Sequence, residues 1–166
     1  MTIELNDLYL YPLNSEELSL WLNNLSLLEK NLGCKYCAEP LKGLFRDVVQ
    51  SQLILGLSEL PENWNWYTNW FLIRKSDKKI IGLLFFKGKP NEKQEVEIGY
   101  GLGKEFENQG YMTKALSGIC IWANNQPGVK QIIAETKIDN YKSQKLLRRC
   151  GFEPFKQSET SICFSL

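Results

Sequence analysis

The chain contains no histidine among its 166 residues. This absence excludes a histidine general base, a Ser-His-Asp triad and a Cys-His pair, and it removes zinc sites that mix cysteine with histidine. If the chain is an enzyme, its protons must move through carboxylates, tyrosines, water or the amine of a substrate. The lack of one residue type therefore narrows the chemistry considerably.

The chain also lacks an excess of one charge and any long apolar run. Twenty Lys and Arg residues against 19 Asp and Glu residues leave a net charge of +1, which gives no general attraction to nucleic acid or to an anionic membrane. Nothing approaches the ~18 consecutive apolar residues of a transmembrane helix, and the first residues lack the pattern of a secretory signal. We expect no nucleic-acid partner and no membrane association.

The five cysteines are an odd number in a chain without an export signal, which favours reduced thiols and a cytoplasmic location. Cys34 and Cys37 form a C-x-x-C, but the other three are scattered, so a second ligand pair is missing and we predict no metal site. The length and a 43% hydrophobic content fit one domain over residues 1–166 with a substantial core.

The most informative stretch is 95–123. Apolar residues alternate from Val96 to Leu102, as in a half-buried strand. After a short loop, apolar residues recur at helical spacing from Met112 to Ala123. A strand, a glycine-bearing loop and a helix leave free N–H groups at the helix start, which favour an anion such as phosphate. The same pattern also fits a strand–loop–helix unit without any ligand.

Two familiar phosphate loops do not fit this stretch. In a Walker A alignment, Gly103-Lys104 is followed by Glu105 instead of Ser or Thr, and Ile98 occupies the position of the first glycine. A dinucleotide fingerprint would need glycine or alanine at Phe106 or at Lys104, depending on the glycine from which it is counted.

The stretch resembles the acyl-CoA-binding motif of the GNAT superfamily of N-acetyltransferases, most closely the branch that acetylates ribosomal-protein N-termini. The family's Gln/Arg-x-x-Gly-x-Gly/Ala pattern falls on residues 107–112, with Gly110 as the matching central glycine. Glu107 replaces a polar or basic residue and Met112 a small one. An acid beside a diphosphate is unfavourable, and methionine narrows the loop. Because backbone N–H groups would do most of the holding, we expect binding to survive both departures.

A second signature lies downstream. Asn140-x-x-Ser143 and Cys150-Gly151-Phe152 resemble the family's Asn-x-x-Ser/Ala start and Gly-Phe end of a short helix. As the cap of that helix, Asn140 would need no further role. Many family members carry a tyrosine seven residues after the asparagine as the acid for the leaving thiolate, and Leu147 stands there. The favoured branch commonly lacks this tyrosine too, so the acid is left unidentified.

The resemblance covers about residues 8–165 and implies a single mixed α/β domain with a mostly antiparallel, V-splayed sheet flanked by helices. It implies acetyl-CoA as co-substrate, no metal, and direct attack by a primary amine on the thioester. The residues expected to bind acetyl-CoA are Tyr100, Gly101, Leu102, Glu107, Asn108, Gln109, Gly110, Tyr111, Met112, Thr113 and Asn140.

The expected catalytic residues are Glu97 and Ser143. Glu97 is the candidate base, directly or through water, with Glu95 behind it, although strand alternation would also suit a solvated Glu97. Ser143 would contact the departing sulfur, and Tyr100 and Tyr141 are weaker candidates for the acid. Backbone N–H groups near Ile98–Tyr100 would stabilise the oxyanion. Gly99 and Gly101 would permit a bulge that frees them.

The sequence is also compatible with other functions. The chain could bind acyl-CoA without turnover, or use the same loop in a nucleotide-binding regulatory domain. The acceptor could be a protein N-terminus, a polyamine, an amino sugar or an amino acid. A basic cluster at 142–149 could reach the 3′-phosphate of CoA, although a solvated helix face explains it more simply.

The rest of the chain reads as alternating short elements. We predict strands at 8–11, 68–74, 80–87 and 131–136, a final hairpin at 153–156 and 160–164, helices from residue 15 and over 42–57, and an irregular 30–39. The first helix would bury Leu18, Trp21, Leu22 and Leu25, and the second Leu44, Val48, Leu53 and Leu55. The aromatic segment 62–70 would close the core, or else grip an acceptor or a second copy in a homodimer.

Overall fold

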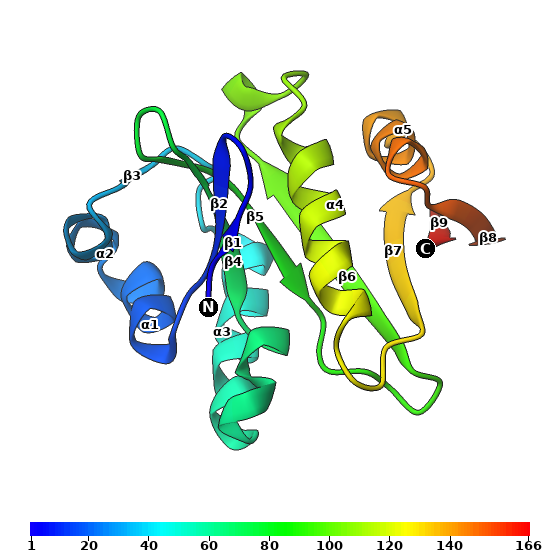
Figure 1. The fold of residues 1–166 in the computed structure, drawn as a ribbon, viewed down its shortest axis with the longest axis horizontal. Helices are drawn as coiled ribbons and strands as arrows, with labels where there is room; N and C mark the ends of the chain where they lie inside the picture. Colours follow the sequence, from blue (N-terminus) through cyan, green and yellow to red (C-terminus); the bar gives the residue numbers. More distant parts are fainter.

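A computed structural model describes all 166 residues, which form one mixed sheet with helices on both faces (Figure 1). The strands run in the spatial order β1-β2-β4-β5-β6-β7-β9-β8, and β3 pairs with β5. Their bounds are β1 (Ile3–Glu4), β2 (Leu8–Pro12), β3 (Lys35–Tyr36), β4 (Asn69–Arg74), β5 (Lys79–Phe86), β6 (Glu95–Leu102), β7 (Gln131–Lys137), β8 (Glu153–Gln157) and β9 (Ser161–Ser165).

Five α-helices and two short 3-10 helices connect these strands. They are α1 (Ser15–Asn23), α2 (Leu25–Leu32), α3 (Gly43–Ser58), α4 (Tyr111–Asn124), α5 (Tyr141–Arg149), η1 (Pro61–Trp66) and η2 (Lys104–Phe106). Helix α4 crosses in front of β6 and beside β7 in Figure 1, and α5 lies at the upper end of β7. No helix is both long enough and apolar enough to cross a membrane.

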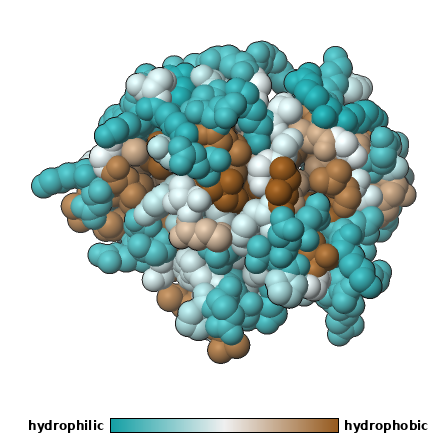
Figure 2. Space-filling model, viewed as in Figure 1, coloured by the Kyte–Doolittle hydropathy of each residue, from teal (hydrophilic) through white to brown (hydrophobic).

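Each face of the sheet has its own core. On one face, Val96 and Ile98 of β6 pack with Leu116 and Ile119 of α4 and with Leu147 of α5. On the other face, the core combines residues of α1, α2 and α3 with Phe71 of β4 and Leu83 of β5. Polar residues cover most of the surface seen in Figure 2, and the hydrophobic residues that reach it gather in a central band.

The sheet consists of two parts that separate along β6. The strand pairs with β7 in parallel only from Glu95 to Glu97, whereas it pairs with β5 in antiparallel fashion from Ile98 to Leu102. Beyond Glu97 the two halves diverge, so that a V opens beside the second half of β6. The predicted V-splayed, mostly antiparallel sheet is confirmed.

The predicted strands and the helices at 111–124 and 141–149 are present with shifts of one or two residues at most. The first helix was predicted too long. Asn24 ends α1, and its side chain accepts from Leu27 N–H at 3.2 Å, so it starts a new helix, α2. Leu25 therefore leaves the buried stripe and is 36% exposed, and part of the predicted irregular segment is helical.

Helix α3 lies where it was predicted but buries a different face. Leu44 is 82% exposed, and Val48 and Leu55 are exposed too. Gln52 is buried instead, because its amide donates to Phe86 O and accepts from the Asn69 amide, both at 3.0 Å. A buried polar side chain that is hydrogen-bonded at both ends fixes the rotation of the helix, and hydrophobicity alone does not reveal such a contact.

The aromatic segment closes the core. Trp66, Tyr67 and Trp70 are buried in the main hydrophobic cluster, and the Trp66 and Phe86 rings lie 4.8 Å apart between centroids in an edge-to-face arrangement. Trp64 packs against the second core, and its indole N–H donates to Leu13 O at 2.7 Å. The favoured prediction, that these rings close the core, is confirmed, and they are not free to form the alternative wall around an acceptor.

Candidate active site

The loop between β6 and α4 ends in an unusual helix start. Gly110 takes the N-cap position with φ of 80°, and no side chain caps the helix. The first intrahelical bond runs from Lys114 N–H to Gly110 O at 3.1 Å. The N–H groups of Tyr111, Met112 and Thr113 therefore have no acceptor within the helix. Together with the dipole of a 14-residue helix, they form a site suited to an anion.

The backbone conformation of Gly110 explains why this residue is a glycine. A Cβ at this residue would meet no atom within 4 Å, so neighbouring atoms do not crowd it. The left-handed backbone is what disfavours other residues. Asn108 in the same loop also has a positive φ, 60°, which asparagine tolerates better than most residues.

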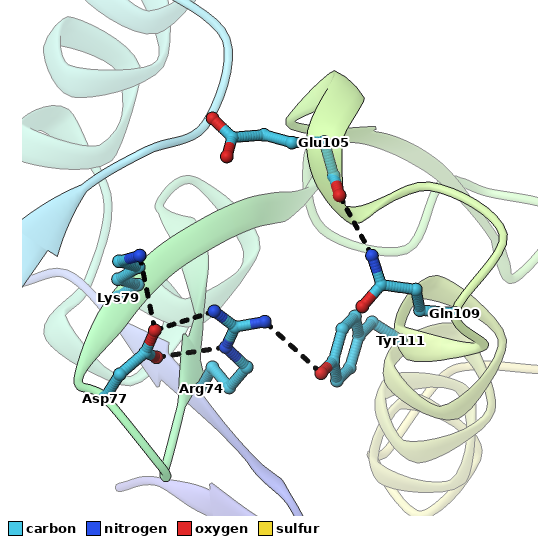
Figure 3. Close-up of polar contacts among 6 residues, drawn as sticks. All are labelled: Arg74, Asp77, Lys79, Glu105, Gln109 and Tyr111. Atoms are coloured by element: carbon cyan, nitrogen blue, oxygen red, sulfur yellow. Dashed lines mark hydrogen bonds and ion pairs between the residues drawn. The ribbon is translucent and has the colours of Figure 1, made fainter.

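Contacts to β4 hold the loop in place (Figure 3). Arg74 pairs with Asp77 at 2.6 Å, lies over the Phe106 ring at 4.9 Å from its centroid, and donates to the Tyr111 hydroxyl at 3.4 Å. The Arg74 guanidinium lowers the pKa of Asp77 to about 2. The Gln109 amide donates back to Glu105 O at 2.9 Å. The start of α4 is thus tied to the neighbouring half of the sheet.

A cleft of about 450 Å³ opens between the second half of β6 and the first turns of α4 and α5, and we name it the β6 cleft. It brings together all but two of the residues expected to bind acetyl-CoA or to be the main catalytic residues, whereas the weaker candidates Glu95 and Tyr141 lie outside it. Those that line it are Tyr100, Gly101, Leu102, Glu107, Asn108, Gly110, Tyr111, Met112, Thr113, Asn140 and Ser143. Gln109, which binds its own loop, and Glu97 do not line it.

The two departures from the phosphate-binding pattern have structural explanations. Glu107 pairs with Lys142 of α5 at 2.6 Å across the mouth of the cleft, so its charge is compensated. Met112 is 6% exposed and packs into the main core. Most of its side chain therefore packs in the core, and it narrows the loop less than expected.

The cations of α5 contribute more to the cleft than the sequence led us to expect. Lys142, Lys145 and Arg149 all line the β6 cleft, whereas a solvated helix face was the simpler interpretation. They are spaced three and four residues apart, which places them on one face of a helix, together with Ser143 and Leu146. This spacing was visible in the sequence and could have indicated their position. Lys145 and Arg149 line the cleft without a carboxylate partner.

Backbone groups of β6 also face the opening. Glu97 O accepts from Lys87 N–H, and Gly103 N–H donates to Ile81 O, so odd-numbered residues direct their polar groups to β5. Because these groups alternate along a strand, those of Tyr100 and Leu102 point away from β5, toward the gap left by β7. The β5–β6 register is continuous. The predicted bulge at Gly99 and Gly101 is wrong, and the divergence of β7 frees these groups instead.

A pair of hydroxyls joins β6 to α5 within the cleft. The oxygens of Tyr100 and Ser143 lie 2.7 Å apart, and Ser143 N–H donates to the Asn140 side chain at 3.1 Å. Burial raises the pKa of Tyr100 to about 12, so the phenol is neutral at physiological pH. Leu147, at the position where the family resemblance would place a tyrosine acid, is fully buried in the core. The phenol that pairs with Ser143 belongs to β6.

Glu97 lies apart from this pair. It forms an ion pair with Lys87 and belongs to the part of β6 that pairs with β7. It lies three positions before Tyr100 along the strand, about 10 Å away. Alternation places it on the face of the sheet that also holds Gly99 and Gly101. A Cβ on Gly99 would lie 2.4 Å from the Phe85 ring, so this ring covers the strand next to Glu97.

A second, smaller cavity of about 260 Å³ meets the β6 cleft, and we name it the Phe85 pocket. Its lining residues are Ala38, Glu39, Phe45, Leu83, Phe85, Tyr100 and Gly101. Glu39, Tyr100 and Gly101 line both cavities. No group of three or more Cys, Asp or Glu side chains is placed to hold a metal ion.

Comparison with known proteins agrees with this geometry. A family model described as the acetyltransferase (GNAT) domain matches residues 34–153. YjdG of Bacillus subtilis (strain 168), an uncharacterised N-acetyltransferase, is 33% identical over 86 residues, which are 52% of this chain and 51% of that protein. The matched region spans about half the length of the curated relatives.

Solved structures match over the whole chain. The ribosomal-protein-S5-alanine acetyltransferase of Vibrio fischeri has a TM-score of 0.72 at 21% identity, covering 100% of this chain and 96% of its own. RimL, a ribosomal L7/L12 α-N-protein acetyltransferase in complex with coenzyme A, has a TM-score of 0.67 at 17% identity, covering 100% and 97%. At these identities, the likeness shows a shared fold.

Proposed function

The chain belongs to the GNAT acetyltransferase domain family, and on this premise we propose that it transfers an acetyl group from acetyl-CoA to a primary amine. The observation that carries the proposal is the β6 cleft, in which the uncapped start of α4 and the Tyr100–Ser143 hydroxyl pair line one cavity. The start of α4 suits a diphosphate, and the hydroxyl pair suits the sulfur of a thioester.

The cleft fits acetyl-CoA along its length. The free N–H groups of Tyr111, Met112 and Thr113 would hold the diphosphate. Lys145 and Arg149, which line the same cleft, would contact phosphate oxygens. The open C=O of Tyr100 and the open N–H and C=O of Leu102 on β6 would pair with the amides of the pantetheine arm, as the groups of a neighbouring strand would. Asn140, which caps α5 and lines the cleft, would lie along the same arm.

These residues also define the chemistry. The amine attacks the thioester carbonyl, forming a C–N bond, and the C–S bond then breaks. The N–H of Tyr100, which points into the gap, would stabilise the negative charge on the carbonyl oxygen. The Tyr100–Ser143 pair would donate a hydrogen bond to the departing sulfur. Because the pKa of Tyr100 is raised to about 12, the phenol acts as a neutral donor and keeps its own proton.

We retain Glu97 as the proposed base, acting through water. An ammonium must lose a proton before it can attack, and Glu97 lies on the face of the sheet that also holds the Phe85 pocket. The Phe85 ring over Gly99 and the ion pair with Lys87 make direct contact with an amine at Tyr100 unfavourable, which leaves the route through water.

Intact-mass detection of acetylated product tests the proposal. The purified chain is incubated with acetyl-CoA and a panel of primary amines that includes short peptides. Mass detection is preferable to a thiol reagent, because the chain has five free cysteines of its own. Acetylated product in excess of enzyme supports transfer. Acetyl-CoA binding without product would instead support a non-catalytic acyl-CoA-binding protein. We place the activity in the cytoplasm, where the five thiols would stay reduced.

A further inference from the structure

The Phe85 pocket lies on the opposite side of β6 from α4. Phe85 and Leu83 belong to β5, and Phe45 belongs to α3. All three pack in or against the second core, away from α4 and α5. The pocket therefore approaches the second half of β6 from the face that the β6 cleft does not use.

The two cavities meet at Tyr100 and Gly101. Both residues line both cavities, and a Cβ on Gly101 would meet no atom within 4 Å. The strand is therefore bare where the cavities join. A molecule held in the Phe85 pocket would reach the hydroxyl pair from the side opposite the bound thioester, which is the approach that attack on a carbonyl requires.

The Phe85 pocket combines one carboxylate with mostly apolar lining residues. Glu39 is the one charged residue that lines it, beside Ala38, Phe45, Leu83 and Phe85. The Tyr36 hydroxyl donates to Glu39 O at 2.7 Å, and Pro40 restricts the backbone before it to extended conformations. These two features fix the backbone of Glu39, which lines both cavities. Its carboxylate forms no ion pair within the chain, in contrast to Glu107.

We infer that Glu39 binds the ammonium of the acceptor, and that the Phe85 pocket selects a primary amine whose neighbouring group is small, apolar and uncharged. This inference rests on the proposed acetyl transfer. An ammonium is the natural partner of a single carboxylate. The volume of about 260 Å³ is below that of a typical pocket for a whole drug-sized ligand, so the pocket holds one side chain or a short alkyl group.

The same lining disfavours other acceptors. A free amino acid would bring a carboxylate next to its amine, and no lysine or arginine lines the pocket to receive it. A polyamine would bury a second ammonium without a second carboxylate, and an amino sugar would place hydroxyls against Phe45 and Phe85. Burying an unpaired polar group is costly, so an amine with an apolar neighbouring group is the best fit.

Kinetics of Glu39→Gln test the inference. Acceptors are a peptide amide that begins with alanine, free alanine, putrescine and glucosamine, and acetyl-CoA affinity is measured in parallel. We expect the variant to raise the KM for the peptide amide roughly two- to fivefold, in keeping with a partly exposed ion pair. Its kcat and its affinity for acetyl-CoA should change little. Glu92→Gln, which removes an exposed carboxylate far from both cavities, should match wild type.

Glu39→Lys provides a second variant, because it reverses the charge at the junction. It should lower the preference for the peptide amide over free alanine. The inference would be overturned if Glu39→Gln left the KM for the peptide amide unchanged, or if the wild-type chain preferred free alanine to the peptide amide. Acetyl transfer itself would stand in either case. A wild-type chain that acetylates none of these amines, yet binds acetyl-CoA, would overturn the proposed function and the inference with it.

Discussion

The phenol oxygen of Tyr100 lies 2.7 Å from the hydroxyl oxygen of Ser143, and this contact joins the diverging edge of β6 to the first turn of α5. The two residues are 43 positions apart in the chain. Asn140 fixes the serine by capping the same helix. The pair thus lies at the place where the sheet opens and where the β6 cleft meets the Phe85 pocket.

Gly110→Val should weaken acetyl-CoA binding by at least tenfold, because a β-branched residue does not tolerate φ of 80° and the loop must rearrange. Calorimetric titration with acetyl-CoA measures the change. Gly128→Val is the matched control, since Gly128 has φ of 79° but lies near Pro90, away from the cleft. Both variants should lose stability, and equal loss of affinity in both would mean that the helix start does not bind the diphosphate.

Glu107→Gln should strengthen acetyl-CoA binding by about two- to fivefold at low salt. Removing the carboxylate releases Lys142 and takes a negative charge away from the phosphates, an effect in the range of a surface ion pair. The gain should shrink as salt screens the charges. Glu105→Gln, on the same loop but outside the cleft, is the control. Weaker binding in Glu107→Gln would show that the ion pair organises the cleft.

Glu97→Gln should lower kcat by about tenfold or more with little change in acetyl-CoA affinity, as expected on losing a general base. Lys87→Gln separates this role from a structural one, because it also breaks the ion pair but keeps the carboxylate. If kcat falls equally in both variants, the loss comes from breaking the ion pair and not from removing a base. Full activity in Glu97→Gln would retire Glu97 as the base.

Stability should fall as the pH rises from 10 toward 12, and Tyr100→Phe should reduce this fall. The folded chain holds the pKa of Tyr100 at about 12 against an ordinary value of 10.0. The unfolded chain thus loses its proton first, so the stabilisation present below pH 10 disappears through this window. Denaturant unfolding at pH 8, 10 and 11.5 measures it. Tyr141→Phe, on the exposed side of α5, should retain the wild-type slope.

Local patterns predicted the part of the site that lies along one stretch of chain. The alternation in β6, the glycine at 110 and the apolar period of α4 each depend on neighbours a few residues away, and all three are present in the structure. Asn140 and Gly151 could likewise be assigned from their positions at the ends of α5, and Gly151 has the left-handed φ of 89° expected after a helix.

Contacts between distant residues could not be read in this way. The partners Gln52 and Asn69, which set the rotation of α3, lie 17 positions apart, and Glu107 and Lys142 lie 35 apart. Glu39 reaches the junction because β3 pairs with β5 just before it. The predicted irregular segment gave no sign of that pairing. Each of these relationships follows from tertiary packing, which hydrophobic periodicity does not encode.

The most direct test of acetyl-CoA binding in the β6 cleft is the melting temperature of the purified chain with acetyl-CoA, with ATP and NAD as controls. A ligand at about 100 times its Kd adds ~2.7 kcal/mol of stability, which for a chain of this size is a rise of roughly 5–10 °C. We predict this rise with acetyl-CoA and none with NAD or ATP. No rise with acetyl-CoA, or an equal rise with ATP, would contradict the assignment of the β6 cleft to acetyl-CoA.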